Sequence, residues 1–292
     1  MQHEHDTALE DEEEARRSEI NALLATTPRL KQIAELFRSG KSVPRQSKDH
    51  LLQRPTFCLV PDLKAQPWWD PSEFPLVTAL EREYSAIRSE ILHVLGVSDV
   101  TLQPLEQAPN DTTETKNTHP LTALPVRTPL HEIRASVARG EWRALYLWKE
   151  GQPVSAHQTL CPHTCALIGQ FVEQSGLEPD ARSVVMQGTG PGYVYVSLLQ
   201  PGTVIQPHCG PTNLRLRVHL ALSCDAGALI TVNGTTRQWQ AGQCLVFDDS
   251  FEHAVHIGAT PRLVLIVDVF HPDLTRNERQ LIRTLLPDVG GD

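Results

Sequence analysis

The chain has 292 residues, of which 40% are hydrophobic and 21% are charged, and its formal net charge is −9. A chain of this length buries a substantial core, either as one large domain or as one domain with an appended segment. The acidic balance, with an acidic run at residues 10–14, argues against a general nucleic-acid binder, because such proteins need a basic stripe to displace counterions.

Signals for membranes and export are absent from the sequence. No stretch approaches the ~18 apolar residues of a membrane span. Residues 1–11 have neither the basic n-region nor the apolar h-region of a secretory signal. If the chain is complete, we therefore expect a cytoplasmic protein, an expectation that does not hold for an excised domain.

The N-terminal part of the chain divides into helical and polar stretches. Residues 6–39 and 75–95 carry apolar side chains at roughly helical spacing, so both are predicted to be helical. Residues 40–55 are basic and polar, as in a linker, and residues 101–128 form a polar, proline-containing stretch typical of a surface insertion. These patterns predict a helical segment with its linker at 1–50 and a domain at 51–292 that carries the insertion.

From residue 183 onward, short β-branched stretches alternate with turn residues. Asn233-Gly234 is the strongest hairpin signal, since both residues tolerate a positive φ. Many short strands with tight turns predict a mainly β fold with flanking helices, a double-stranded β-helix of the jelly-roll or cupin kind. The predicted strands are 183–186, 193–199, 214–222, 228–232, 243–247 and 262–269, and a closing helix is predicted at 275–286.

The six cysteines do not indicate a disulfide framework, because a chain of this length does not need one. Most have apolar neighbours and are interpreted as buried thiols. Cys161 and Cys165 lie in a predicted short helix at 161–173 and are close enough to pair or to bind a metal with further ligands, and the sequence leaves this open.

The predicted strand at 214–222 alternates strictly between apolar and polar residues over its first seven positions. Its leucines and valine point to one face, and Arg215, Arg217 and His219 point to the other. In a sandwich, the apolar face is expected in the layer between the sheets. The polar face is then either exposed to solvent, the commoner case for such a strand taken alone, or it lines an anion-binding cavity.

Two histidines lie at the ends of predicted strands and change this balance. His208 precedes the strand with the two arginines, and His253 precedes the strand that Arg262 opens. Imidazole suits divalent iron, and arginine suits a dicarboxylate held in a fixed orientation. A metal site next to an anion site is therefore predicted from His208, Arg217, His253 and Arg262.

These residues resemble the aspartyl/asparaginyl β-hydroxylase family. The matching runs are PGTVIQPHCGPTNLRLRVHL, GQCLVFDDSFEHAV and RLVLIVDVFHPDL, with weaker similarity in GEWRALYLW, CPHTCALI and PWWDPSEFPLV. The resemblance covers roughly residues 55–285, interrupted by the polar insertion. It is specific, because a generic two-histidine barrel would not reproduce the three runs together.

The resemblance implies an iron(II)- and 2-oxoglutarate-dependent dioxygenase with His208 and His253 as the metal ligands. Most 2-oxoglutarate oxygenases add a carboxylate two residues after the first histidine, whereas this chain has Gly210 there. The family shares the absence of that carboxylate, which leaves the third facial position to water. The resemblance also implies that the enzyme uses O2 together with 2-oxoglutarate.

The resemblance also implies how the co-substrate is held. Arg217 and His219 match the pair that binds the 1-carboxylate end of 2-oxoglutarate, and Ser197 and Arg262 match the pair that binds the far carboxylate. Arg215 and Asp249 match positions that face the substrate. The expected reaction hydroxylates the β-carbon of Asp or Asn in a peptide or protein and releases succinate and CO2. The best-known members act in the lumen of the endoplasmic reticulum, the alternative compartment for an excised domain.

Two other functions are compatible with such a barrel. It could have lost turnover and serve as a binding or scaffolding protein, since a fold does not guarantee a function. It could also hold zinc, although zinc usually takes at least three protein ligands. Six further residues are expected to be structural: Trp68, Trp69 and Trp148 through packing, Asp248 as a brace before His253, and Asp268 and His271 through hydrogen bonding.

Overall fold

The computed structural model describes residues 53–96, 137–173 and 179–286, and upstream of these residues 14, 15, 17, 18, 20–26, 29–31 and 34. The predicted insertion at 101–128 lies outside the described residues, as does most of the predicted linker. All the described residues between 14 and 34 are helical. None of the helices in the described part is long and apolar enough to cross a bilayer.

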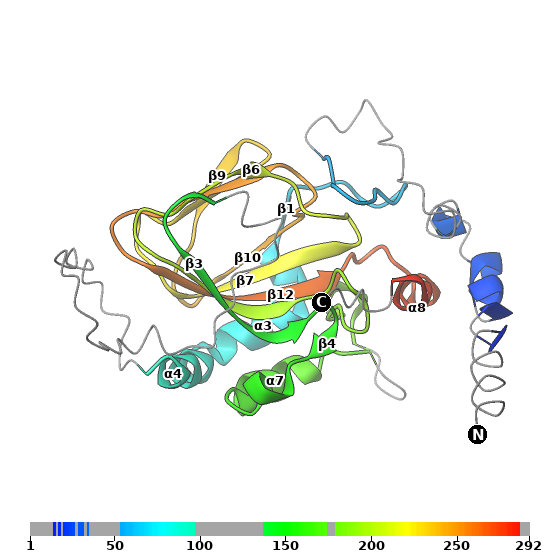
Figure 1. Cartoon of the computed structure of the whole chain (residues 1–292), viewed down its shortest axis with the longest axis horizontal. Helices are drawn as coiled ribbons and strands as arrows, with labels where there is room; N and C mark the ends of the chain where they lie inside the picture. Colours follow the sequence, from blue (N-terminus) through cyan, green and yellow to red (C-terminus); the bar gives the residue numbers. More distant parts are fainter. Residues whose placement is uncertain are drawn as a thin grey trace, which may run out of the picture.

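Two antiparallel sheets form the body of the molecule, and Figure 1 shows them face to face. The predicted jelly-roll-like double sheet with flanking helices is confirmed. Among the described strands neither sheet closes on itself, so the two sheets form an open pair. The larger sheet has the order β1 (Trp68–Trp69), β10 (Cys244–Phe247), β7 (Arg215–Ser223), β12 (Arg262–Phe270), β5 (Val194–Leu199), β3 (Trp142–Lys149), β4 (Gln152–Pro153). The smaller sheet has the order β2 (Val137–Arg139), β6 (Val204–His208), β11 (His253–His256), β8 (Leu229–Val232), β9 (Thr235–Gln238).

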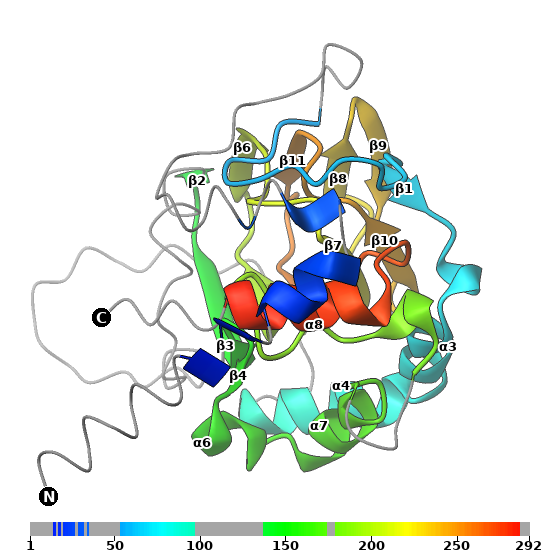
Figure 2. The same cartoon turned by 90° about the vertical axis from the view of Figure 1, so that its right-hand side faces the viewer.

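Helices cover the outer face of the larger sheet in both views (Figures 1 and 2). The helix predicted at 75–95 is in fact two helices, α3 (Pro75–Arg82) and α4 (Tyr84–Val94), because Glu83 leaves the helical region at φ −90° and ψ 9°. A capping box between Thr275 and Glu278 starts the predicted closing helix, α8 (Arg276–Leu285). The remaining helices are η1 (Pro71–Glu73), α6 (Ser155–Gln158), α7 (Pro162–Gly169) and η3 (Ala181–Ser183).

One predicted strand is wrong and one hairpin is confirmed. Residues 183–186 form no strand beyond a single bridge between Val185 and Val269. The Val185 N–H donates to Phe171 and the Met186 N–H to Asp268, so these apolar residues mark burial rather than a ladder. The hairpin between β8 and β9 turns at Asn233-Gly234, with φ of 50° and 75°, as predicted.

The apolar face of β7 does not lie between the sheets, contrary to the prediction. Its leucines and valine pack under α3, α4 and α7, as part of a cluster that includes Leu80, Ile91 and Ile168. The opposite face, with Arg215, Arg217 and His219, therefore points into the space between the sheets. A second cluster fills the rest of that space with aromatic and aliphatic side chains from both sheets, including Trp142, Ile230, Trp239 and Phe247.

All six cysteines lie in the described residues and are free thiols. Cys161 and Cys165 lie at and within α7, and burial raises the pKa of each to about 12. Within the described residues, no group of three or more His, Cys, Asp or Glu side chains is arranged to hold a metal ion. The two cysteines are therefore interpreted as packing residues.

Candidate active site

Two histidine rings meet where β6 ends and β11 begins. His208 and His253 are cross-strand partners in the antiparallel ladder between these strands. Their ring centroids are 4.1 Å apart, with an angle of 50° between the ring planes. Residues 45 positions apart in the sequence are thus close enough to bind one ion.

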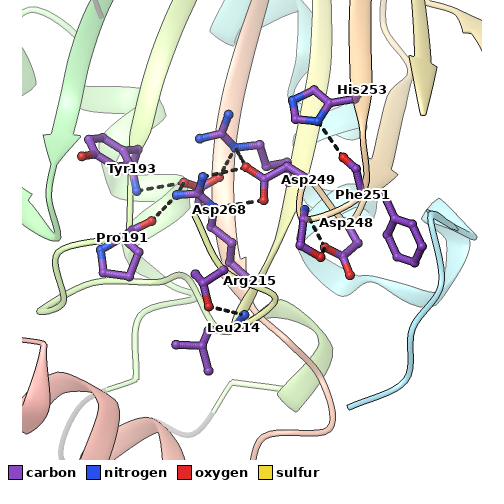
Figure 3. Close-up of polar contacts among 12 residues, drawn as sticks. Pro191, Tyr193, Leu214, Arg215, Asp248, Asp249, Phe251, His253 and Asp268 are labelled. Carbon is purple, nitrogen blue, oxygen red and sulfur yellow. Dashed lines mark hydrogen bonds and ion pairs between the residues drawn. The ribbon is translucent and has the colours of Figure 1, made fainter. Parts of the chain in front are cut away.

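The backbone sets the tautomer of both rings. The Nδ1 atom of His208 lies 2.8 Å from the Gln206 carbonyl oxygen, and that of His253 lies 2.9 Å from the Phe251 carbonyl oxygen. Figure 3 shows the second of these contacts. A carbonyl only accepts, so each Nδ1 donates its proton and each Nε2 keeps a free lone pair. Burial lowers the pKa of both rings, that of His253 to about 3, so both rings are neutral.

Gly210, two residues after His208, has no room for a side chain. A Cβ atom there would lie 2.4 Å from Oδ2 of Asp249, far inside van der Waals contact. The Gly210 N–H also donates to the Asp249 carbonyl oxygen at 2.6 Å. The position that carries a metal-binding carboxylate in facial-triad oxygenases is therefore closed by a carboxylate from another segment.

Four buried charged side chains form a compact ion cluster beside the histidines (Figure 3). Arg215 donates to Asp249 through two nitrogens, at 2.6 and 3.3 Å, and its side chain is 3% exposed. Arg217 reaches both carboxylates through Nε, at 3.2 Å from Asp249 and 3.0 Å from Asp268. Burial raises the pKa of Asp249, but the two guanidinium groups outweigh it and hold the pKa below its usual range.

Arg215 and Asp249 were expected to face the substrate, and in the structure they bind each other. Arg215 also donates to the Pro191 carbonyl oxygen and to Asp268, so most of its donors are occupied by the protein. Substrate contact by this pair stays a prediction. Asp248, expected as a brace, is one: its carboxylate accepts from the backbone N–H of Ser250 and the side chain of Gln53.

Arg262 is a buried cation without a carboxylate partner among the described residues. Its Nη2 donates to Ser197 Oγ at 2.7 Å, and its Nε has no hydrogen-bond partner there. Burial lowers the pKa of Arg262 to about 10, so it stays charged at neutral pH. A buried charge is costly unless an opposite charge compensates it, so this environment favours an anionic ligand.

Aromatic contacts connect the histidine pair to Arg262. Phe247 lies 5.8 Å from the His253 ring and 4.9 Å from the His219 ring. His219 in turn stacks on Trp239 at 6.0 Å, and the guanidinium carbon of Arg262 lies 4.8 Å from the Trp239 ring. Phe247, His219, Trp239 and Arg262 thus form one continuous wall beside the His208–His253 pair.

His219 itself is buried with unsatisfied ring nitrogens. It is 5% exposed, and neither ring nitrogen has a partner among the described residues. Burial and the nearby Arg262 cation lower the pKa of His219 well below its ordinary value, so the ring is neutral. Unsatisfied buried polar atoms cost about 1–3 kcal/mol each, which a bound polar ligand would offset.

The residues present fit an iron centre with 2-oxoglutarate. Two neutral imidazoles with free Nε2 atoms suit divalent iron and leave positions for non-protein ligands. Zinc fits less well, because the described residues offer no third protein ligand at this pair. Three aromatic residues of the site were not predicted from the sequence: Phe247 and Trp239, which contact His219, and Trp142, whose Nε1 donates to Ser197 Oγ at 2.9 Å. For Trp239 the sequence held no signal.

Comparison with known proteins places this site in a family. The family model for aspartyl/asparaginyl beta-hydroxylase matches residues 81–272, which include all eight candidate site residues. The chain belongs to this family.

Relatives extend the similarity beyond that range. The chain is 36% identical over 223 residues to "Aspartyl/asparaginyl beta-hydroxylase" of Mus musculus, covering 75% of this chain and 25% of that protein. It is 38% identical over 151 residues to "Aspartate beta-hydroxylase domain-containing protein 2" of Homo sapiens, covering 50% of this chain and 38% of that protein. The chain therefore spans only part of the length of these aspartyl/asparaginyl β-hydroxylase relatives.

Proposed function

We propose that this chain is an iron(II)- and 2-oxoglutarate-dependent dioxygenase that hydroxylates the β-carbon of an Asp or Asn residue in a peptide or protein. The observation that carries the proposal is the buried Arg262 cation, uncompensated by any described carboxylate, in the wall beside the His208–His253 pair. A pair of histidines that binds a metal would by itself suit many reactions. The added anion site favours a co-substrate with a carboxylate.

His208 and His253 would hold the iron through their Nε2 atoms. Bound iron would supply oxygen activation coupled to the decarboxylation of 2-oxoglutarate to succinate and CO2. The protein's own part is to keep both imidazoles neutral and oriented. It does so through burial and through the two backbone carbonyls that accept from Nδ1.

Two groups of side chains would hold the ends of 2-oxoglutarate. Arg262 and the Ser197 hydroxyl would bind the far carboxylate, and this pairing would neutralise the buried charge. Arg217 and His219 would bind the 1-carboxylate end. The neutral His219 ring has one N–H to donate, and the terminal nitrogens of Arg217 remain for the ligand, since its bonds to described residues run through Nε.

The wall around this site would keep water from the reacting atoms. Phe247 is 1% exposed and Trp239 is 1% exposed, and both contact His219. An enclosed site of low polarity strengthens the ionic contacts to the co-substrate and suppresses side reactions.

The substrate class rests on the family and on the names of the relatives. The mouse relative is named an aspartyl/asparaginyl hydroxylase, and we extend that activity to this chain as a proposal. A peptide is the proposed partner.

Anaerobic titration of the metal-free protein with iron(II) and 2-oxoglutarate tests the metal and co-substrate together. We expect the weak visible charge-transfer band of the iron–2-oxoglutarate chelate to develop in the wild type and not in His253→Ala. His256→Ala is the matched control, because His256 lies exposed on the same strand. A wild type without the band would overturn the proposal.

Turnover distinguishes an active enzyme from a binding barrel. Asp- and Asn-containing peptides would be incubated with iron(II), 2-oxoglutarate and O2, and products analysed by mass spectrometry. Succinate formation with the gain of one oxygen atom on the peptide is expected. Chelate formation without any 2-oxoglutarate decarboxylation, even slow, would instead support a binding protein.

A further inference from the structure

Asp268 lies at the centre of the buried ion cluster. Its side chain is 0% exposed, and it stands directly opposite Arg217 in the ladder between β12 and β7. Its Oδ1 lies 3.0 Å from Nε of Arg217, and its Oδ2 lies 3.1 Å from Nη1 of Arg215. Oδ2 also accepts the Tyr193 N–H at 3.2 Å, as Figure 3 shows, so the carboxylate itself is held in place by the backbone.

The contacts of Arg217 differ from those of Arg215 in one respect. Arg215 uses Nε and both terminal nitrogens on protein acceptors. Arg217 contacts described residues through Nε alone, and it does so with Asp268 and Asp249. A guanidinium held at Nε keeps its terminal N–H groups available in a fixed plane, which is what bidentate recognition of a carboxylate requires.

The charges of the cluster balance, because two guanidinium groups face two carboxylates. Burial raises the pKa of Asp268, whereas the two guanidinium groups at 3.0 and 3.1 Å stabilise its charged form, so the geometry is that of a carboxylate paired with two cations. Considered only as a charge, that carboxylate repels an incoming dianion. Its removal should then tighten binding of 2-oxoglutarate.

We propose that Asp268 is a positioning residue that orients the Arg217 guanidinium toward the 1-carboxylate of 2-oxoglutarate. The inference rests on the proposed function, since it presumes that this co-substrate binds. It makes the opposite prediction from the charge argument. Without Asp268, Arg217 keeps its charge but loses the bond that fixes its plane, so co-substrate binding should weaken although repulsion has fallen.

The experiment measures the dissociation constant of 2-oxoglutarate by anaerobic calorimetry, with manganese(II) in place of iron. Asp268→Asn keeps the shape of the side chain, removes its charge and replaces one acceptor oxygen by an NH2 group, so it cannot accept both from Arg217 Nε and from the Arg215 and Tyr193 donors. Asp268→Glu keeps the charge and displaces the carboxylate by one methylene.

Glu173→Gln is the matched control. Glu173 also bridges two arginines, Arg279 at 2.7 Å and Arg283 at 2.8 Å, and its side chain is 6% exposed. It lies outside the proposed active site and joins the end of the α7 region to α8. If breaking any acidic bridge between two arginines were enough to weaken 2-oxoglutarate binding, this variant should bind 2-oxoglutarate more weakly too.

We expect both Asp268 variants to bind 2-oxoglutarate at least tenfold more weakly than the wild type, and Glu173→Gln to bind it unchanged. Unchanged or tighter binding by Asp268→Asn overturns the positioning role while the proposed function stands. A wild type that does not bind 2-oxoglutarate overturns both. If both Asp268 variants fail to fold, as judged by circular dichroism, Asp268 is a structural residue and the inference is wrong.

Discussion

Replacing Arg262 by Met should stabilise the ligand-free protein and abolish its response to 2-oxoglutarate. The folded protein holds this guanidinium at 2% exposure without a carboxylate partner among the described residues, and burial lowers its pKa from 12.5 to about 10. Because the folded-state pKa is the lower one, the folded state carries the full destabilisation at every pH below about 10. The cost is released only as the pH rises above that value.

The magnitude follows from the size of the shift. At roughly 1.4 kcal/mol per pKa unit, burial of the Arg262 charge costs about 3 kcal/mol. The variant also loses the hydrogen bond to Ser197, worth about 1 kcal/mol, and the contact with Trp239, worth about 1 kcal/mol. The net gain in unfolding free energy is then about 1 kcal/mol, which raises Tm by roughly 2–4 °C in a domain of this size.

Thermal unfolding with and without 2-oxoglutarate and manganese(II) provides the assay. At about a hundred times its dissociation constant, the co-substrate should stabilise the wild type by about 2.7 kcal/mol, and it should leave the variant unchanged. Arg237→Met is the control, since Arg237 also lies over a tryptophan, Trp68, at 4.4 Å, but is exposed. An Arg262→Met variant that is less stable than the wild type and still responds to 2-oxoglutarate would refute the reasoning.

Three further outcomes are expected. His208→Ala should reduce iron(II) binding by at least a hundredfold in an equilibrium titration, whereas His256→Ala should not; equal losses would argue against a shared ion. Gly210→Asp should not supply a third ligand, because its Cβ would meet the Asp249 carboxylate at 2.4 Å; we expect lower Tm and weaker iron binding, and tighter binding would contradict the steric argument. Glu173→Gln should lower the unfolding free energy at pH 7 by about 2 kcal/mol, the usual scale for hydrogen bonds to a charged group, because its bridge to Arg279 and Arg283 is part-buried. Burial raises the pKa of Glu173, but its arginine partners outweigh burial and hold the pKa below its usual range. The difference in unfolding free energy should therefore be complete above about pH 5 and vanish as the pH falls through the folded-state pKa. A difference that stays constant during acid denaturation would exclude this role of the Glu173 charge.

Local patterns were sufficient for much of the fold. Strict alternation identified β7, and the Asn233-Gly234 pair identified the hairpin between β8 and β9, because both signals depend on neighbours in the sequence. The strand predicted at 183–186 is wrong, because its pattern also depended only on neighbours in the sequence. An apolar run records burial, and only contacts with distant segments decide whether its backbone pairs as a ladder.

The sequence by itself determined the chemistry available to this protein: two imidazoles at strand ends, arginines on the strands that follow, and a glycine where a third metal ligand would otherwise be. Tertiary structure alone decided how those groups are used. It covered the leucine face of β7 with helices and so turned the charged face inward. It paired Arg215 and Arg217 with acidic residues and gave Arg262 no acidic partner among the residues that the structure describes. Such choices depend on which side chains from distant segments share a buried space, where the cost of an unpaired charge is set by its surroundings and not by its neighbours in the chain.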